Sequence, residues 1–551
     1  MKSVAPIGSR CYVKIFAALA ASMLVLGLGG CARSERAVDA GVREGILHIN
    51  NGAEVPDLDP HTVTGMPEFR IMDALFEGLV EKDPDTREIL PAMAESWTVS
   101  EDRLSYVFHL RETAAWSDGR PVTSDDFVRS YERAMNPLLA SDYAYLFGII
   151  RGADQYMSGA LEDFAQVGVT ARDTHTLEIQ LEHPVPFFLS LLTYPCWRPL
   201  PMHVVEEHDG LRRRGATWTR EGNLVSSGPF VMTRWEPNRV LVVERNPHYW
   251  DAEVVGLNAI HFYPVESIDT EERMFRSGQL HITSQVPTAK LEGYAAQPNS
   301  PLRIDPLLGT YFFRFNVTRP PLDNPLVRRA LSLAIDREAI VQRITRSGEQ
   351  PAANFAPPGA GGFQPTPQVA YDPEAARQAL AAAGFPGGAG FPEIELLYNT
   401  SEAHRTIAEA IQQMWKTTLG VDVGIFNQEW KVFLDSLETL DFDVARSGWI
   451  AVYDDANPFL EIFTTGNPNN RTGWGDAAYD RLHEASMREI DPVRRLQILE
   501  ELDARLIEAA VVAPIYHYTN DYLIDPRVKG WNPGSLDKRR YKLVRLENGA
   551  E

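Results

Sequence analysis

Apolar and polar residues alternate in two short segments of the chain. Apolar side chains occupy every second position there: Leu104, Tyr106, Phe108 and Leu110, then Leu177, Ile179 and Leu181. Because successive side chains of a strand point to opposite faces of its sheet, this period of two predicts half-buried β-strands.

Helices are predicted where a capping residue precedes a helical run. Three pairs place a capping side chain before a proline at the first helical position: Asn324-Pro325, Asp372-Pro373 and Asp491-Pro492. They predict helices over 326–345, 374–383 and 493–510. Thr123, with Asp126 three residues later, predicts a fourth capped start. Strands interleaved with helices over the whole length indicate α/β lobes rather than a sandwich or a bundle.

The first thirty residues have the pattern of an export signal. Lys2, Arg10 and Lys14 precede an apolar run from Ile15 to Leu28. This run is shorter than the roughly twenty residues that a membrane-spanning helix needs. Leu28-Gly29-Gly30-Cys31 follows and resembles a bacterial lipoprotein box, so residues 1–30 are expected to be removed and Cys31 to carry the lipid. A secretory signal with a chance cysteine is the alternative.

Charge and cysteine content exclude several classes of protein. The chain has 551 residues, with 53 basic against 75 acidic side chains and a formal charge of −22. Nucleic-acid binding is disfavoured because it needs clustered Lys and Arg. The three cysteines contain no Cys-x-x-Cys pair and cannot form a disulfide framework. No segment after residue 30 approaches eighteen uninterrupted apolar residues, so a lipid anchor is the one membrane attachment that the sequence predicts.

The sequence has few motifs that are typical of catalysis or metal binding. Gly-x-Ser-x-Gly and the Gly-Lys pair of a P-loop are both absent. His203 and His208 are five residues apart, whereas two helical metal ligands need a spacing of three or four. The acidic pairs Asp125-Asp126 and Asp454-Asp455 are adjacent residues that usually point in different directions. We therefore predict a binding protein without a cofactor or metal, and not an enzyme.

Several stretches, taken in order, resemble extracytoplasmic oligopeptide-binding proteins, the solute receptors of peptide ABC importers. They cover essentially all of the mature chain. The stretches are Asp59-Pro60-His61, Leu75-Phe76-Glu77-Gly78-Leu79, Ala94-Glu95-Ser96-Trp97, Tyr106 to Arg111, Trp116-Ser-Asp-Gly119, Ser227-Gly-Pro-Phe230, Glu244 to Trp250, Phe315-Asn316, Val327 to Leu331, Asp336-Arg337, Arg446-Ser-Gly-Trp449 and Val528-Lys-Gly-Trp531.

The resemblance implies a two-lobed α/β architecture, the type II fold of periplasmic binding proteins (cluster C), with an extra subdomain and a hinge. Lobe I would comprise residues 31–77, 200–304 and 520–551. Lobe II, the extra subdomain, would comprise 78–199, and lobe III 305–519. Closure of such lobes about a hinge is a known response to a ligand.

The resemblance also implies a ligand site between the lobes. Thr64-Gly65-Met66 and Gly448 to Ile450 would make strand-like contacts with the backbone of an extended peptide. Trp430 and Trp449 match positions that line the ligand pocket. His404 and Arg446 match groups that can meet the peptide carboxylate, arginine through paired hydrogen bonds and histidine depending on its charge.

One position departs from the family pattern. Where the family has an aspartate that holds the ligand's α-ammonium, this chain has Val452. Removing an ammonium from water without a carboxylate partner is costly, so valine cannot take over that role. Either Asp454 or Asp455 serves as the substitute anion, or the ligand lacks the amine, as an N-blocked peptide, a cyclic peptide or a non-peptide solute would.

The predicted function is that of the substrate-binding component of a peptide ABC transporter. The partners would be a short oligopeptide and a permease and ATPase complex, with no nucleic acid. The protein would be a monomer, held by its lipid in the periplasm or at the cell surface. The alternatives are a receptor for an N-blocked peptide or a non-peptide solute, a signalling lipoprotein of the same fold, and an exported hydrolase without a recognisable site.

Overall fold

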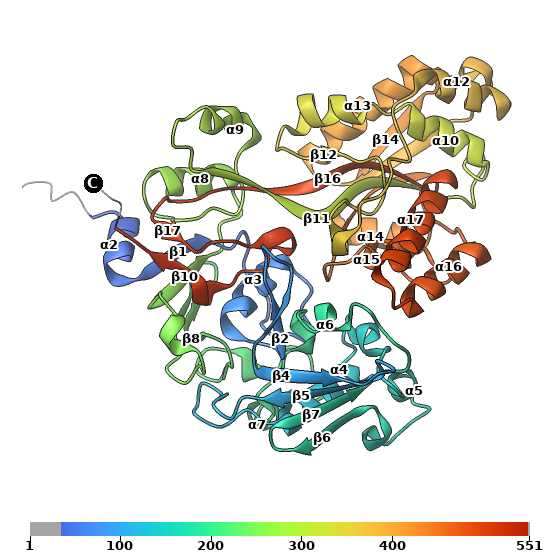
Figure 1. The fold of residues 1–551 in the computed structure, drawn as a ribbon. Helices are drawn as coiled ribbons and strands as arrows, with labels where there is room; N and C mark the ends of the chain where they lie inside the picture. The colour runs from blue at the N-terminus through green and yellow to red at the C-terminus, as the bar shows by residue number, and fades with distance from the viewer. Residues whose placement is uncertain (1–34, 549–551) are drawn as a thin grey trace, which may run out of the picture.

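The computed structural model describes residues 35–548, so the predicted signal peptide and Cys31 lie outside the described residues. Three sheets dominate these residues, and we name the regions by the predicted lobes (Figure 1). The lobe I sheet has the order β1 (Ile46–Asn50), β10 (Ala259–Tyr263), β9 (Val240–Arg245) and β8 (Phe230–Glu236). The antiparallel lobe II sheet has the order β4 (Ala94–Val99), β5 (Ser105–Leu110), β7 (Thr176–Gln180) and β6 (Val169–Asp173).

The largest sheet belongs to lobe III and has six strands in the described residues. Its order is β12 (Gln350–Pro351), β16 (Val512–Leu523), β11 (Leu302–Phe315), β15 (Val444–Ile450), β13 (Ile394–Asn399) and β14 (Val423–Gln428). Two short hairpin-like pairs complete the strands, β2 (Val80–Lys82) with β3 (Ile89–Pro91) and β17 (Val528–Lys529) with β18 (Arg545–Leu546).

Helices cover these sheets in all three regions. Those up to residue 301 are α2 (Ala37–Glu44), α3 (Met66–Leu75), α4 (Ser124–Met135), α5 (Ala153–Met157), α6 (Phe188–Leu191), α7 (Met202–Glu207), α8 (Ile268–Arg276) and α9 (Thr288–Ala295). The later ones are α10 (Pro325–Leu333), α11 (Arg337–Ile340), α12 (Pro373–Ala382), α13 (Glu402–Leu419), α14 (Trp430–Glu438), α15 (Asn457–Leu460), α16 (Ala477–Arg488) and α17 (Pro492–Glu508). Within residues 35–548, none of the helices is long and apolar enough to cross a bilayer.

Most of the local predictions agree with these elements. The two alternating segments form β5 and β7, and Thr123 with Asp126 forms a capping box at the start of α4. Asp372 and Asp491 cap α12 and α17 as predicted. The single helix predicted over 326–345 is wrong: α10 ends at Leu333, and a new helix begins after Asp336, whose side chain accepts the N–H of Ala339.

Two long antiparallel strands connect lobe I to lobe III. β11 and β16 pair from Leu302 opposite Leu523 up to Arg314 opposite Val512, and Figure 1 shows them running side by side across the molecule. The predicted lobe boundaries fall inside this pair, where Asp305 lies opposite Asn520. A two-stranded connection with few residues is suited to act as a hinge.

The loop after β15 connects lobe III to the core of lobe II. Tyr453 is buried among the apolar side chains of lobe II, and its ring stacks on Phe187 with centroids 4.8 Å apart. Residues 450–455 therefore lie at the contact between lobes, which is where the predicted ligand site should be.

Candidate functional site

One edge of β15 is only partly paired among the described residues. On one side it pairs with β11 along its whole length. On the other side β13 pairs with it only at Val444 and Ala445, while the far edge of β13 pairs with β14 from Ile394 to Asn399. Among the described residues, 446–450 therefore have no strand partner on this edge. Such an edge presents free backbone N–H and C=O groups, to which an extended ligand can add as another strand.

Arg446 is the first residue of this unpaired edge, and its hydrogen-bond partners among the described residues are neutral. Its guanidinium lies 4.6 Å from the centroid of the Tyr311 ring. Nη2 donates to the Tyr518 hydroxyl at 3.0 Å and Nη1 to the Asn399 side-chain oxygen at 3.3 Å, while Nε has no hydrogen-bond partner in the described structure. A largely buried cation that is not neutralised by a protein carboxylate is well suited to bind the carboxylate of a ligand.

His404 lies beside Arg446, in the first turn of α13. Its Nδ1 is 3.3 Å from the Tyr311 hydroxyl. Burial, and after it the cation of Arg446, lower the pKa of His404 to about 3. The imidazole is therefore neutral near pH 7, and of these two side chains only Arg446 carries a positive charge.

A cavity of about 170 Å³ adjoins the other end of the unpaired edge. Thr64 and Met66 line it from the segment at the start of α3, and Ile450 and Val452 line it from the end of β15 and the following loop. Gly65, between the first two, is an extended residue that caps α3. Both segments that were predicted to contact a peptide backbone thus border the same cavity.

The remaining predicted residues of β15 and α14 differ in their surroundings. A Cβ atom at Gly448 would lie 2.6 Å from the Tyr518 hydroxyl, so a larger residue there would require the Tyr518 side chain to shift. Trp449 is half-buried against the lobe III core, and its indole N–H has no partner in the described structure. Trp430 is 53% exposed at the start of α14 and stacks on Phe433. Neither tryptophan lines the 170 Å³ cavity, so their contact with a ligand stays a prediction.

A second cavity, of about 340 Å³, lies next to the first and shares Leu536 and Lys538 with it. Its walls come from lobe II at Lys82 and Arg87 and from lobe III at Asp454. The two cavities together form the candidate ligand site between the lobes.

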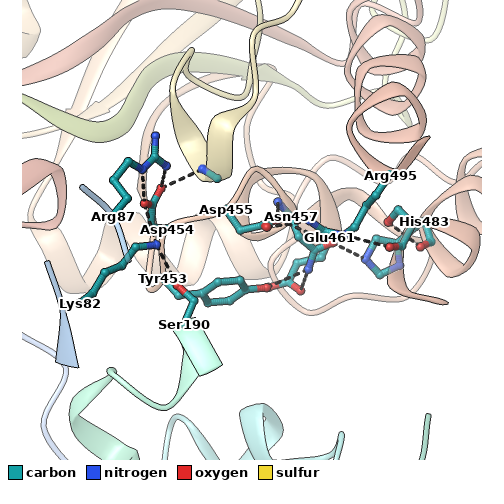
Figure 2. A network of polar contacts seen from close by, with 12 residues as sticks. Lys82, Arg87, Ser190, Tyr453, Asp454, Asp455, Asn457, Glu461, His483 and Arg495 are labelled. Carbon is teal, nitrogen blue, oxygen red and sulfur yellow. Dashed lines mark hydrogen bonds and ion pairs between the residues drawn. The ribbon is translucent and has the colours of Figure 1, made fainter. Parts of the chain in front are cut away.

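Asp454 forms ion pairs across the lobes (Figure 2). Its carboxylate lies 2.9 Å from Lys82 Nζ, accepts the Nε–H of Arg87 at 2.9 Å, and also accepts the N–H of Gly361. Burial acts to raise the pKa of Asp454, but Lys82 and Arg87 hold it below its usual value. The carboxylate is therefore ionised, and a ligand amine would have to displace two cations to bind it.

Asp455 points away from Asp454, toward Arg495 (Figure 2). The two side chains form a two-pronged ion pair, with Nη1 and Nη2 of Arg495 at 2.7 and 2.8 Å from the carboxylate. Asp455 also accepts the N–H of Asn457. It lines neither cavity, so its predicted role as an anion for the ligand would require breaking a buried ion pair.

Lys538 is a residue of the candidate site that the sequence analysis did not identify. It lies between η10 (Gly534–Leu536) and the C-terminal strand, and it lines both cavities. The only local signal is the basic run Lys538-Arg539-Arg540, which has neither period nor motif spacing. Its position in the site becomes visible only in the folded chain.

The chain is similar to known proteins over most of its length. Residues 88–471 match the family described as "Bacterial extracellular solute-binding proteins, family 5 Middle". The chain belongs to this family. It is 36% identical to the periplasmic oligopeptide-binding protein OppA of Salmonella typhimurium over 527 residues, which cover 93% of this chain and 95% of that protein. Family 5 membership confirms the predicted relationship to extracytoplasmic solute-binding proteins, and this relative is named as a binding protein.

Two further relatives are named for two different kinds of ligand. The chain is 33% identical to the "Probable deoxycholate-binding periplasmic protein YgiS" of Escherichia coli, covering 88% of this chain and 90% of that one. The solved structure of the Escherichia coli murein tripeptide binding protein MppA matches with a TM-score of 0.80 at 34% identity, covering 91% and 98%. This match confirms the two-lobed fold. Because the relatives are named for different ligands, the ligand of this chain depends on its own side chains.

Proposed function

We propose that the protein is the extracytoplasmic substrate-binding component of a peptide ABC transporter. It captures an oligopeptide between its lobes and delivers it to the permease and ATPase complex. The observation that carries this proposal is the unpaired edge of β15, which runs from Arg446 to the wall of the 170 Å³ cavity. Pairing through backbone groups is how a receptor binds peptides of varied sequence.

The two ends of this edge support one direction for the bound peptide. The carboxylate of the peptide would pair with Arg446, which forms no ion pair with a carboxylate among the described residues, and its amino end would reach the cavity beside Val452. The peptide would then run antiparallel to β15, as β11 does on the other side. Residues 446–450 span roughly 13 Å at the usual rise of a strand, the length of a short extended peptide.

Closure couples this binding to transport. A ligand favours the closed arrangement only by contacts that it makes more strongly there. A peptide between Thr64 and Ile450 would touch lobe I and lobe III at once, and both residues border one cavity. The proposal includes export by the predicted signal, attachment by a lipid on Cys31, and action as a monomer in the periplasm or at the cell surface.

A receptor for a non-peptide solute or an N-blocked peptide is the second candidate. Val452 favours it, since an apolar side chain lies in the cavity that would receive the amino end. A relative named for deoxycholate binding supports the view that this fold accepts other chemistry.

Replacing Arg446 with methionine is expected to weaken the binding of a short peptide by about 100-fold, because two charge-assisted hydrogen bonds to the carboxylate are lost. The C-terminally amidated twin of the same peptide should bind weakly to the unmodified protein and be little affected by the substitution. Isothermal titration calorimetry on both peptides measures this difference.

Arg405→Met is the matched control, since Arg405 is exposed on α13 and pairs with Glu409. It should leave both affinities unchanged. Equal binding of acid and amide by the unmodified protein would remove Arg446 as the carboxylate partner. Failure of every peptide of about two to six residues to bind, together with binding of a bile acid, would favour the second candidate.

A further inference from the structure

Lys538 lies in the ligand site, and among the described residues it donates hydrogen bonds to Thr193 but forms no ion pair with a carboxylate. Its Nζ donates to the carbonyl oxygen of Thr193 at 2.8 Å and to the hydroxyl of the same residue at 2.6 Å. An ammonium has three N–H donors, and among the described residues the third has no protein acceptor. This donor belongs to a side chain that lines both cavities, so a ligand can satisfy it.

The carboxylates in the wall of the 170 Å³ cavity are already neutralised. Asp73 pairs with Arg198 at 2.6 Å and accepts the N–H of Arg539. Asp537 pairs with Arg70 at 2.9 Å and with Arg539 at 3.3 Å. A ligand amine in this cavity would therefore have to compete with an arginine for either carboxylate.

The rest of the wall is mostly apolar and aromatic. Met66 and Phe69 contribute from α3, Tyr143 from lobe II, and Val452 from lobe III. Such a surface disfavours an unpaired ammonium, because no carboxylate offsets the free energy of removing the charge from water. It favours the carbon atoms of an acyl group, whose burial is stabilising.

The lowered pKa of Lys538 favours an anionic hydrogen-bond acceptor near its Nζ. Burial lowers the pKa of Lys538 to about 7, with Asp73 acting in the opposite direction. An anionic oxygen near Nζ would stabilise the charged form, whereas a second ammonium would destabilise it further.

We infer that the ligand is a peptide whose amino end is acylated, and that the acyl group presents a carbonyl or carboxylate oxygen to Lys538 in the cavity beside Val452. This inference rests on the proposed function, because it takes the direction of the peptide from Arg446, and of the second candidate it adopts the N-blocked peptide and not the non-peptide solute. It names the substrate class of that site: N-acylated peptides, and among them those with an anionic acyl group.

Glu68 is the competing explanation, and it supplies a control. It is buried on α3, one of its oxygens has no hydrogen-bond partner among residues 35–548, and burial raises its pKa. Its carboxylate lies over Gly65, and it is not part of the cavity wall. If Glu68 were the partner of a ligand amine, Glu68→Gln would weaken the binding of free-amine peptides.

The experiment uses one tripeptide in three forms: with a free amine, N-acetylated and N-succinylated. Calorimetry with the purified chain should give the tightest binding for the succinylated form and the weakest for the free amine. Lys538→Met should weaken binding of the succinylated form by about 10- to 100-fold, because a hydrogen bond to a charged group is lost, and should leave the free-amine form unchanged or tighter.

Three variants complete the design, each with its melting temperature checked against the unmodified protein. Lys538→Gln keeps a donor for Thr193 without the charge and should weaken the succinylated form selectively. Val452→Asp places a carboxylate in the same cavity wall and should shift the preference toward the free amine. Lys416→Met, at an exposed lysine that pairs with Asp422, should change nothing.

The outcomes separate this inference from the proposed function. Tightest binding of the free-amine form, or equal losses for all three forms in Lys538→Met, overturns the inference and leaves the peptide receptor intact. A loss of free-amine binding in Glu68→Gln also overturns it. If none of the three forms binds, the proposed function fails and this inference fails with it.

Discussion

Replacing Asp455 with asparagine is expected to lower the free energy of unfolding by about 3–5 kcal/mol. Asp455 and Arg495 form a two-pronged ion pair in which each side chain is only 7% exposed. The substitution removes the negative charge and leaves the guanidinium of Arg495 buried with neutral partners, such as the carbonyl oxygen of Ser486. The cost comes chiefly from this uncompensated buried charge rather than from the attraction that is lost.

Urea titration followed by circular dichroism measures the expected loss at Asp455. Asp422→Asn is the control, because Asp422 is 77% exposed and pairs with the exposed Lys416, and such pairs contribute only about 0–1 kcal/mol. Adding Arg495→Met to Asp455→Asn should restore part of the stability, since no buried charge then remains. This explanation would be contradicted if the two substitutions acted independently. The free energy of unfolding of the double variant would then lie below that of Asp455→Asn by the full loss that Arg495→Met causes on its own.

Capping pairs and alternation predicted individual elements well because their causes lie within a few residues. Asp372 and Asp491 bind N–H groups two or three residues away, and that geometry is set by the local sequence. The helix predicted over 326–345 failed for a related local reason. Asp336 inside the run caps a second helix, so one apolar pattern extends over two elements.

The partners of the acidic pair could not be predicted in this way. Asp454 and Asp455 are neighbours with the same side chain, yet Asp454 binds Arg87, 367 residues away, and Asp455 binds Arg495, 40 residues away. Only the folded chain decides which carboxylate meets which cation. The sequence could predict that two carboxylates lie near the end of β15, and it could not predict that both would already be paired.

Lys538 was missed for the same reason. Its hydrogen-bond partner Thr193 is 345 residues away, and nothing near Lys538 in the sequence indicates that two cavities meet there. Resemblance to a family gave Arg446 and the strand-like segments, because those positions match the family's motifs. A feature without a counterpart in those motifs requires the three-dimensional arrangement.

Replacing Asp454 with asparagine is expected to weaken the binding of every ligand by about 10- to 100-fold, whatever its amino end carries. Asp454 of lobe III pairs with Lys82 and Arg87 of lobe II, so its charge favours the arrangement in which the lobes are in contact. Arg87 is 37% exposed, and water screens that pair more than the one with Lys82, which is 15% exposed. Most of the lost ligand affinity should therefore come from the loss of the ion pair between Asp454 and Lys82.

Calorimetry with a free-amine tripeptide and its N-acetylated twin tests this role of Asp454 against the alternative. If Asp454 favours contact between the lobes, both affinities fall by the same factor, and Lys82→Met gives a similar loss that does not add to that of Asp454→Asn. If Asp454 instead binds the ligand's amine, the loss falls on the free-amine peptide alone, and Lys82→Met strengthens its binding by releasing the carboxylate. The two roles predict opposite signs for Lys82→Met, and that variant alone is enough to decide between them.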